Sequence, residues 1–437
     1  MHFKIYKQLL SLTSSETTHF NVTSLKLKYI YSHSVSRKGS SQLNTRLLLL
    51  TIGAFAIGTD SYIVAGILLD IANDMSISIS SAGQLVTVFA LTIAITAPVL
   101  TTLTAKMSPT KILFWTMLLF SIGNIISFLS STFAMLIISR IIAAMGAALY
   151  FPIATLIAAK LAAPGKQGKS ISAVSSGLTI AITLGVPIGT WLGNIFNWRI
   201  AFLIIAIVGF FVCLLTTIMI PKLEQTNDNA STKDQLPPLK KATVFFLMTA
   251  ILFITTGSFA VYTFIDPILQ AIGDFNLIGL SSMLALFGAS SIIGVWLGGY
   301  LNDRIGSLPT IYLTIAIKIL SLFAFSFIML YDFSSNVILA GLATISWGIT
   351  AWMLNAPLLN YLITISPKSP SLLLALNATF SYLGTSAGSA LGGFVIDNDA
   401  IEMLGLICGL CQLIALLIIL VTAKVQKRQA LAQQLEV

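Results

Sequence analysis

The feature that most constrains this chain is a series of long apolar runs between Arg46 and Ala423. A helix needs about 20 predominantly apolar residues to cross the hydrocarbon core of a bilayer, and the runs have this length. Hydrophobic residues make up 56% of the 437 residues and charged residues only 9%, whereas a soluble domain carries about 25% charged residues. The sequence therefore predicts an integral membrane protein and excludes a soluble enzyme and a receptor with a single span.

The runs are continuous rather than alternating, so they predict helices and not the strands of a membrane β-barrel. Twelve helices are expected, at 47–69, 84–104, 112–129, 135–158, 171–193, 200–220, 242–265, 280–301, 310–330, 338–363, 372–396 and 403–423. A polar segment at 221–241, with Pro237 and Pro238 in it, separates the first six from the last six. We therefore expect an all-α membrane fold of two six-helix bundles, 46–220 and 242–423, joined by a cytoplasmic linker and followed by a tail at 424–437.

Residues 1–45 have a different composition. They are basic and rich in Ser and Thr, contain one acid (Glu16), and include no long apolar run. We expect a disordered cytoplasmic tail. The same composition fits an organelle transit peptide or a start codon assigned too far upstream, and the sequence leaves these readings open. No apolar region followed by a small-residue cleavage site is present, so a removed signal peptide is not expected.

Lysine and arginine are unevenly distributed between the loops, and this bias sets the orientation. With the N-terminus inside, the outer loops carry a single basic residue, Arg199, and most of the acids. The outer acids are Asp70, Asp74, Asp266, Asp274, Asp332, Asp397, Asp399 and Glu402. The inner loops hold Lys106, Lys111, Lys160, Lys166, Lys169, Lys222, Lys233, Lys240, Lys241, Arg304, Lys368, Lys424, Lys427 and Arg428. We expect a multi-pass plasma membrane protein, in the inner membrane of a bacterium, with both termini cytoplasmic. The net charge of +9 then reflects loop placement, and no nucleic-acid partner is expected.

The two halves repeat a pattern of glycines. Gly185, Gly189 and Gly193 are spaced by four in the fifth predicted helix, and Gly384, Gly388 and Gly392 are spaced by four in the eleventh. The offset is 199 residues (384 − 185) for all three pairs. Glycines on one face let neighbouring helix backbones approach closely, and a matched pair of such faces is typical of the parallel repeats of transporters.

Several segments resemble the major facilitator superfamily, over essentially the whole of 46–423. The segment 294–306, with Asp303, Arg304 and Gly306, resembles the loop motif between its eighth and ninth helices. The segment 184–199 resembles the fifth-helix motif of the proton-driven efflux members. The segment 58–68 resembles the first helix of the drug and sugar efflux branch, and 262–267 and 346–348 resemble bacterial sugar and arabinose efflux permeases.

This resemblance implies a drug:proton antiporter that rocks two bundles around a central cavity. It also implies a gating role for the two motifs, at Asp303, Arg304, Gly306, Gly185, Pro187, Gly189 and Gly193. Asp303 and Arg304 are expected to hold the inner helix ends together when the outer side is open. The corresponding loop of the first half, 103–111, lacks the acid, the glycine and the arginine pair of the full motif, so a symmetric latch is not expected. Pro187 follows Val186 rather than Gly185 directly, as in the sugar-efflux-like branch.

Two ionisable residues lie inside predicted helices, where a charge is costly and is either functional or paired. Asp60 lies roughly 20 Å along the first helix at 1.5 Å per residue, past the midplane towards the outside. A carboxyl that takes up a proton from one side and releases it to the other is what proton coupling requires. Arg140 matches the efflux family's fourth-helix arginine, which the resemblance implies assists proton transfer or pairs with the acid. The alternatives are a structural hydrogen bond for Asp60 and contact with outer headgroups for Arg140.

Aromatic and amide side chains at membrane depth are candidates for substrate contact. We select Tyr62, Trp352, Asn355 and Asn377, because an amide at that depth needs a polar partner and because Trp352 and Asn355 share one helix face. Helix aromatics are more often packing residues or interface anchors. Lys318, near the middle of the ninth helix, receives no role from the sequence, since that helix usually faces lipid in the family it resembles.

The remaining chemistry-bearing residues narrow the function. All three histidines lie in the tail and all three cysteines in apolar runs, so no metal site, no cofactor and no catalytic residue is expected. We predict a monomeric proton-coupled secondary transporter that exports a small organic solute, such as a sugar, drug or nucleoside-like compound. A proton-coupled importer of the same fold and a transport-inactive membrane sensor are the alternatives. The identity of the solute, the direction of transport and the proton stoichiometry stay open.

Overall fold

The computed structural model describes residues 22–163, 165–223, 242–273, 275, 277–331, 336–365 and 370–435, and this part of the chain contains helices and no strand. Most of the predicted linker (224–241) and the first half of the predicted tail (1–21) lie outside the described residues. So do the loop charges Lys233, Lys240, Lys241, Asp274, Asp332 and Lys368. The chain divides into two units, Met1–Arg46 and Leu47–Val437.

In the first unit, residues 22–46 form the beginning of helix α2 (Val22–Ile63), where the sequence led us to expect a disordered tail. Residues 22–63 contain no proline, so nothing in this stretch removes a backbone donor. Extending an existing helix costs much less than nucleating one, which accounts for the continuation of α2 beyond its apolar part.

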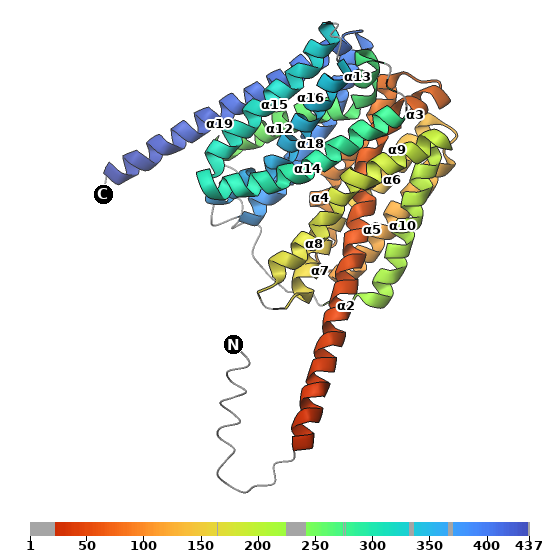
Figure 1. The fold of residues 1–437 in the computed structure, drawn as a ribbon, viewed down its shortest axis with the longest axis vertical. Coiled ribbons are helices and arrows are strands. Elements are labelled where there is room, and N and C mark those ends of the chain that lie inside the picture. The colour runs from red at the N-terminus through yellow and green to blue at the C-terminus, as the bar shows by residue number, and fades with distance from the viewer. Residues whose placement is uncertain are drawn as a thin grey trace. The chain divides into compact units, whose positions relative to one another are not determined.

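The first bundle of the second unit follows the predicted order closely (Figure 1). After α2 it contains η1 (Val64–Gly66), α3 (Leu68–Asp74), α4 (Ile79–Leu103), α5 (Pro109–Leu129), α6 (Phe133–Ala147), α7 (Tyr150–Leu161), α8 (Gln167–Ile180), η2 (Ala181–Gly185), α9 (Val186–Ile195) and α10 (Trp198–Met219).

The second bundle contains α12 (Ala242–Thr263), α13 (Ile265–Ile272), α14 (Leu277–Ile305), α15 (Ser307–Leu330), α16 (Asn336–Met353), α17 (Asn355–Ile365), α18 (Pro370–Asp397), η4 (Ile401–Met403) and α19 (Leu404–Leu435). Eleven segments among the described residues are long and apolar enough to cross a membrane, and each coincides with a predicted helix. The remaining predicted helix, 372–396, is α18, whose 28 residues are rich in Gly, Ser and Thr and therefore less apolar. The all-α membrane fold is confirmed.

Prolines explain where the long helices are interrupted. A proline has no N–H for the carbonyl four residues earlier, and its ring clashes with that carbonyl. Pro152 and Pro357 follow the breaks between α6 and α7 and between α16 and α17, and Pro267 follows the break between α12 and α13. Pro187 lies just after η2, a single wider π-helical turn, which is a common response to a missing backbone bond. The fourth and tenth helices are thus broken in the same way in the two bundles.

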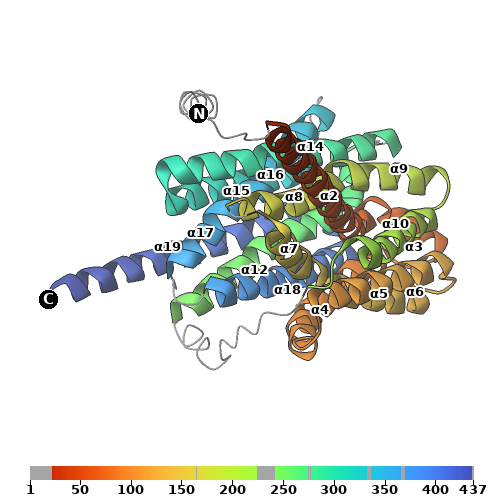
Figure 2. The ribbon, with the colours of Figure 1, turned by 90° about the horizontal axis from the view of Figure 1, so that it is seen from below.

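The two predicted glycine faces occupy equivalent positions. Gly185 and Gly189 pack the fifth helix against α2, at Thr59 and Ile63, and Gly193 packs it against Ile67, just after η1. Gly384, Gly388 and Gly392 pack α18 against α12 in the same manner, and Figure 2 shows α12 and α18 side by side. At Gly388 a Cβ atom would collide with the backbone carbonyl of Thr256, so no larger residue fits without separating the helices.

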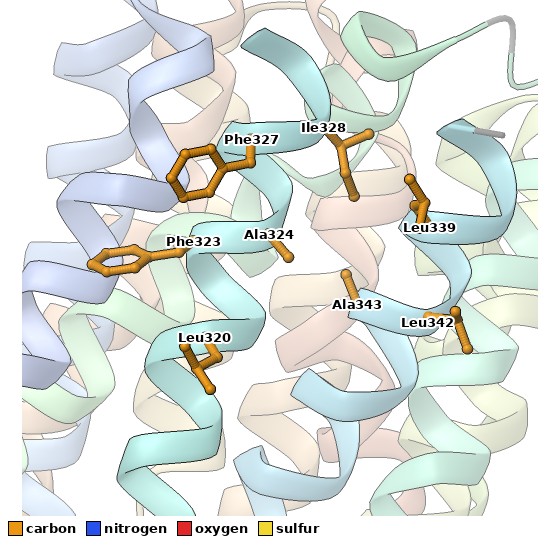
Figure 3. A pocket seen from close by; sticks show the side chains of 8 residues that line it. All are labelled: Leu320, Phe323, Ala324, Phe327, Ile328, Leu339, Leu342 and Ala343. Atoms are coloured by element: carbon orange, nitrogen blue, oxygen red, sulfur yellow. The ribbon is translucent and has the colours of Figure 1, made fainter. Parts of the chain in front are cut away.

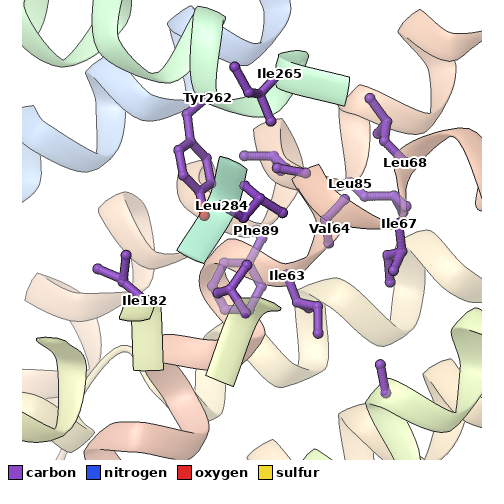
Figure 4. Close-up of a cluster of buried hydrophobic side chains, with 14 of the residues drawn as sticks. Ile63, Val64, Ile67, Leu68, Leu85, Phe89, Ile182, Tyr262, Ile265 and Leu284 are labelled. Carbon is purple, nitrogen blue, oxygen red and sulfur yellow. The ribbon is translucent and has the colours of Figure 1, made fainter. Parts of the chain in front are cut away.

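The bundles are joined towards one end, which we call the α3–α13 end. A buried apolar cluster there combines Ile63, Ile67 and Phe89 of the first bundle with Ile265 and Leu284 of the second (Figure 4). Two hydrogen bonds also cross between the bundles. The Ser389 hydroxyl donates to the Gly83 carbonyl at 2.7 Å, and the Thr183 hydroxyl donates to the Gly288 carbonyl at 3.1 Å. These contacts lie in the halves of their helices nearest the α3–α13 end, which is therefore closed.

We predict that Gly388→Leu destabilises the second bundle by about 1–3 kcal/mol, the usual cost of overpacking. Gly299→Leu is the matched control, because a Cβ atom at Gly299 meets nothing. The measurement is thermal unfolding in detergent with a thiol-reactive dye, which reports exposure of the buried cysteines at 213, 408 and 411. An equal unfolding temperature for the two variants would contradict the packing role of the glycine face.

Candidate functional site

The two predicted intramembrane charges form an ion pair within the first bundle. Arg140 Nη1 lies 2.6 Å from Asp60 Oδ1, and the exposed fractions of the two side chains are 1% and 0%. Arg140 Nη2 also donates a hydrogen bond of 3.2 Å to the backbone carbonyl of Asp60. The pair therefore joins α6 to α2 out of contact with solvent, and the alternative in which Arg140 contacts the outer headgroups has no support in this geometry.

The surroundings of the pair are largely apolar. The Arg140 guanidinium carbon lies 4.3 Å from the Phe89 ring centroid and 5.4 Å from that of Phe202. Aromatic faces attract a cation, but they do not replace a counter-charge. Among the described residues, Arg140 Nε and Asp60 Oδ2 have no hydrogen-bond partner. Because breaking a buried pair by neutralising one partner leaves an uncompensated charge, each charge depends on the other.

A second polar feature lies in the other bundle. A cavity of about 230 Å³ is lined by residues of α12, α14, α15, α16, α17 and α18, together with one residue of α2. All four predicted substrate residues line it: Tyr62, Trp352, Asn355 and Asn377. The structure thus brings together four side chains that the sequence selected from three predicted helices, whereas their contact with a substrate stays a prediction.

Three further residues of the cavity wall were missed or left without a role. Lys318 on α15 lines the cavity and is only 2% exposed. Tyr262 and Phe287 complete an aromatic wall with Trp347, with the Phe287 and Trp347 ring centroids 4.5 Å apart. A lysine in the middle of a membrane helix without nearby charges already indicates a special role in the sequence. Helical periodicity alone, however, does not tell which face of the helix meets lipid, so the cavity could not be predicted from it.

Helix α2 connects the ion pair to the cavity. Asp60 and Tyr62 are two residues apart, so they point about 200° apart around a helix of 3.6 residues per turn. Asp60 faces α6, while the Tyr62 ring lies 5.3 Å from that of Tyr262 and 5.7 Å from that of Phe259 on α12. Helix α2 therefore contributes Asp60 to the ion pair on one side and Tyr62 to the wall of the cavity on the other.

The predicted gating residues fall into two groups. In the fifth helix, Gly185 is the last residue of the π-helical turn η2, and Pro187, Gly189 and Gly193 follow it in α9. Both η2 and α9 contact α14 of the second bundle. Asp303 and Arg304 lie exposed at the end of α14. Asp303 Oδ1 accepts a hydrogen bond of 3.3 Å from Asn302, and Arg304 Nη1 donates one of 2.9 Å to Tyr300. Gly306 follows with a φ of 87°, which favours glycine. Within the described part of the chain, neither charge forms an ion pair, so no latch is formed in this conformation.

The α3–α13 end carries its own charged groups. Arg199 Nη1 lies 2.7 Å from Asp74 Oδ2 and joins α10 to α3. Asp266 lies on α13, beyond the membrane span Ala242–Thr263, and its side chain is buried. Burial raises the pKa of Asp266 to about 7; a hydrogen bond with Gln270 lowers this pKa, and the nearby charge of Asp70 raises it. Of the elements that contact α13, α3 contributes Asp70 and Asp74 and η4 contributes Glu402.

An apolar groove lies elsewhere in the second bundle. A groove of about 410 Å³ between α15 and α16 is lined by eight apolar side chains, among them Phe323, Phe327 and Leu342 (Figure 3). It offers no side chain that could orient a polar solute. Among the described residues, no group of three or more His, Cys, Asp or Glu side chains is placed to hold a metal ion.

Comparison with known proteins identifies the family to which this fold belongs. The family model of the Major Facilitator Superfamily matches residues 50–389. An uncharacterised MFS-type transporter of Bacillus subtilis (strain 168), YbcL, is 32% identical over 386 residues, 88% of this chain and 97% of its own. The inner membrane transport protein YdhP of Escherichia coli (strain K12) is 30% identical over 82% of this chain and 90% of its own.

Solved structures agree on the fold. The crystal structure of a bacterial homologue of the human lysosomal transporter Spinster, inward-facing and unoccupied, has a TM-score of 0.71 at 16% identity and covers 88% of this chain and 97% of its own. A variant of the nucleoside transporter NupG has a TM-score of 0.69 at 13% identity and covers 87% of this chain and 99% of its own. The chain is a multi-pass membrane transporter that belongs to the Major Facilitator Superfamily.

Proposed function

We propose that this transporter is a proton-coupled antiporter that exports a small organic solute by alternating access. The main support for this proposal is the buried Asp60–Arg140 pair, because Asp60 lies on α2 and the opposite side of α2 lines the cavity. A carboxylate inside the membrane can carry a proton, and the helix that holds it also forms part of the wall of the solute space.

The coupling follows from the charges of the pair. A proton on Asp60 removes the negative charge, whereas the guanidinium keeps its proton. Arg140 would then be a buried cation without a counter-charge, which costs several kcal/mol. Moving α2 relative to α6 relieves this cost by letting water or another group reach Arg140. Because Tyr62 moves with α2, protonation changes the cavity, and solute in the cavity in turn opposes protonation.

The scaffold is suited to such a movement. The α3–α13 end is closed by the apolar cluster and by the two hydrogen bonds between bundles, and the loop charge bias predicts that this end faces outwards. The conformation would then be open to the cytoplasm. The π-helical turn at Pro187, held against Gly288 of α14, is where the two bundles would separate. The resemblance of this segment to the efflux motif supports export rather than import.

The first test substitutes the carboxylate. Asp60→Asn keeps the shape of the side chain but cannot carry a proton, so we expect pH-gradient-driven transport to fall to background while expression is unchanged. The measurement uses proteoliposomes with an imposed pH gradient and a panel of sugars, drugs and nucleosides, with proton release read by an internal dye. Asp397→Asn, which alters an exposed loop acid, is the control. Full transport by Asp60→Asn would refute the coupling role, and solute movement in the same direction as protons would identify an importer.

The second test concerns pH at the closed end. The closed conformation holds Asp266 with a pKa of about 7, whereas opening exposes it and returns its pKa towards its usual value. The closed state therefore binds the proton more tightly, so acid favours closure, and opening increases as pH rises from the usual value of 3.8 to about 7 and levels off above it. We expect labelling of Ala72→Cys on α3 to rise at least about tenfold within this window, since one pKa unit corresponds to a factor of ten.

Asp266→Asn should abolish the dependence in the same labelling experiment, since an amide does not titrate. A pH profile that is unchanged in Asp266→Asn would assign the effect to another group, with Asp70 and Glu402 next to be substituted.

The third test concerns the proposed latch. If Asp303 holds the inner ends together when the outer side is open, Asp303→Asn shifts the population towards the conformation seen here. We expect labelling of Gly168→Cys, at the exposed start of α8, to increase about tenfold, comparable to losing one hydrogen bond to a charged group. Solute affinity should not change. Equal labelling with and without the substitution would contradict the latch.

A further inference from the structure

Lys318 is a buried lysine for which the described residues supply no partner. It is 2% exposed, lies midway along α15, and makes no hydrogen bond or ion pair among the described residues; the ion pairs there are Arg140–Asp60 and Arg199–Asp74. A lysine in a membrane span normally pairs with another group or reaches the interface. Its position on the cavity wall leaves the cavity itself as the place where a counter-charge can be supplied.

Other buried polar atoms belong to residues in the wall of the same cavity. Among the described residues, Tyr262 Oη, Trp347 Nε1 and Asn377 Oδ1 are buried and have no hydrogen-bond partner, and all three residues line the cavity. Buried polar groups are nearly always hydrogen-bonded, so each exception needs an explanation. Three of them in the wall that also contains Lys318 favour a ligand that supplies a negative charge and, once the wall adjusts to it, hydrogen-bonding atoms.

The walls of the cavity define the rest of the ligand. Four aromatic rings lie in contact, with centroid separations of 5.3 Å between Tyr62 and Tyr262, 5.4 Å between Tyr262 and Phe287, and 4.5 Å between Phe287 and Trp347. Aromatic side chains favour stacked or edge-to-face contact with a further ring. The volume of about 230 Å³ accommodates one or two fused rings rather than an extended chain.

We infer that the solute is a small aromatic monoanion, such as an aromatic carboxylate, whose charge is bound by Lys318 and whose ring lies among the aromatic residues of the cavity. This inference rests on the proposed export function and names the class of solute for that site. It also gives a reason for a lysine at this depth, since an unpaired charge inside the bilayer costs stability unless a ligand uses it. Tyr62 belongs to α2, so an anion bound beside it is in contact with the helix that carries Asp60.

The test is a binding measurement on the full-length protein in detergent, without a proton gradient. Benzoate and 1-naphthoate are the probes, and benzamide and 1-naphthamide are their uncharged counterparts of nearly equal shape. Quenching of tryptophan fluorescence reports binding, because Trp347 and Trp352 line the cavity. We expect each anion to bind at least tenfold more tightly than its amide. Equal affinities, or no binding of either anion at millimolar concentration, would overturn the inference.

Lys318→Met identifies the charged group. It should weaken anion binding at least tenfold and leave amide binding unchanged, whereas Lys318→Arg should retain the preference for the anion. The unfolding temperature of Lys318→Met should be equal to that of the natural protein or higher, since an unpaired buried charge is removed, so loss of binding can be separated from loss of fold. Lys111→Met, which alters an exposed lysine, is the matched control. Unchanged anion binding in Lys318→Met would refute the role of Lys318.

Asp60→Asn separates this inference from the proposed function. It should keep the preference for the anion in the binding measurement while it loses pH-driven transport. If it loses neither, the proton coupling is wrong and the solute class stands. If the natural protein shows no preference for the anion while Asp60→Asn still abolishes transport, the solute class is wrong and the coupling stands.

Discussion

The structure depends on the rule that a charge inside a bilayer must be paired or used. Asp60 and Arg140 satisfy it by pairing, at 2.6 Å and with both side chains almost fully buried. The pair is costly to form, because both ions lose their hydration, and costly to break, because each would leave the other uncompensated. A pair of this kind contributes little net stability; under the proposed coupling, one proton on Asp60 would decide the relative positions of α2 and α6.

Under the proposed function, a movement of α2 would also change the cavity, because Tyr62 on α2 lines it. α2 is packed on its other sides by small residues, because Gly185 and Gly189 allow the fifth helix to approach its backbone. Proline positions interrupt the backbone ladder of the fourth, fifth, seventh and tenth helices, so these helices bend at defined points. Rigid close packing along α2 combined with bends in the surrounding helices is suited to moving one bundle against the other as a body, rather than deforming either.

Much of this arrangement could be predicted from the sequence, for reasons that differ between features. The apolar runs located every membrane span to within about five residues, and α18 as well, because the length of a span is set by the bilayer; they did not predict that α2 begins at Val22 or that α19 continues to Leu435. Asp60 and Arg140 could be selected because a charge at that depth is exceptional. Burial of Lys318 could not be predicted, since depth follows from position in the sequence but the lipid-facing side of α15 follows from packing against α16 and α19. Asp303 forms no ion pair among the described residues. Whether the expected latch forms depends on the conformation of the transporter, which a sequence does not specify.

The two bundles share a scaffold but not their charges. The glycine faces repeat at a constant offset and the proline breaks recur in the fourth and tenth helices, yet α12 and α16, which correspond to α2 and α6, contain no charged residue. Conversely, α5 corresponds to α15 but carries only Lys111, at its end. The repeated pattern of glycines and prolines accounts for the common architecture. It does not account for the charged residues, and because each intramembrane charge costs free energy, we expect each of them to have a function. Under the proposed function, the ion pair of the first bundle carries the proton and Lys318 in the second bundle binds the solute, while α2 contributes Asp60 to the pair and Tyr62 to the cavity wall.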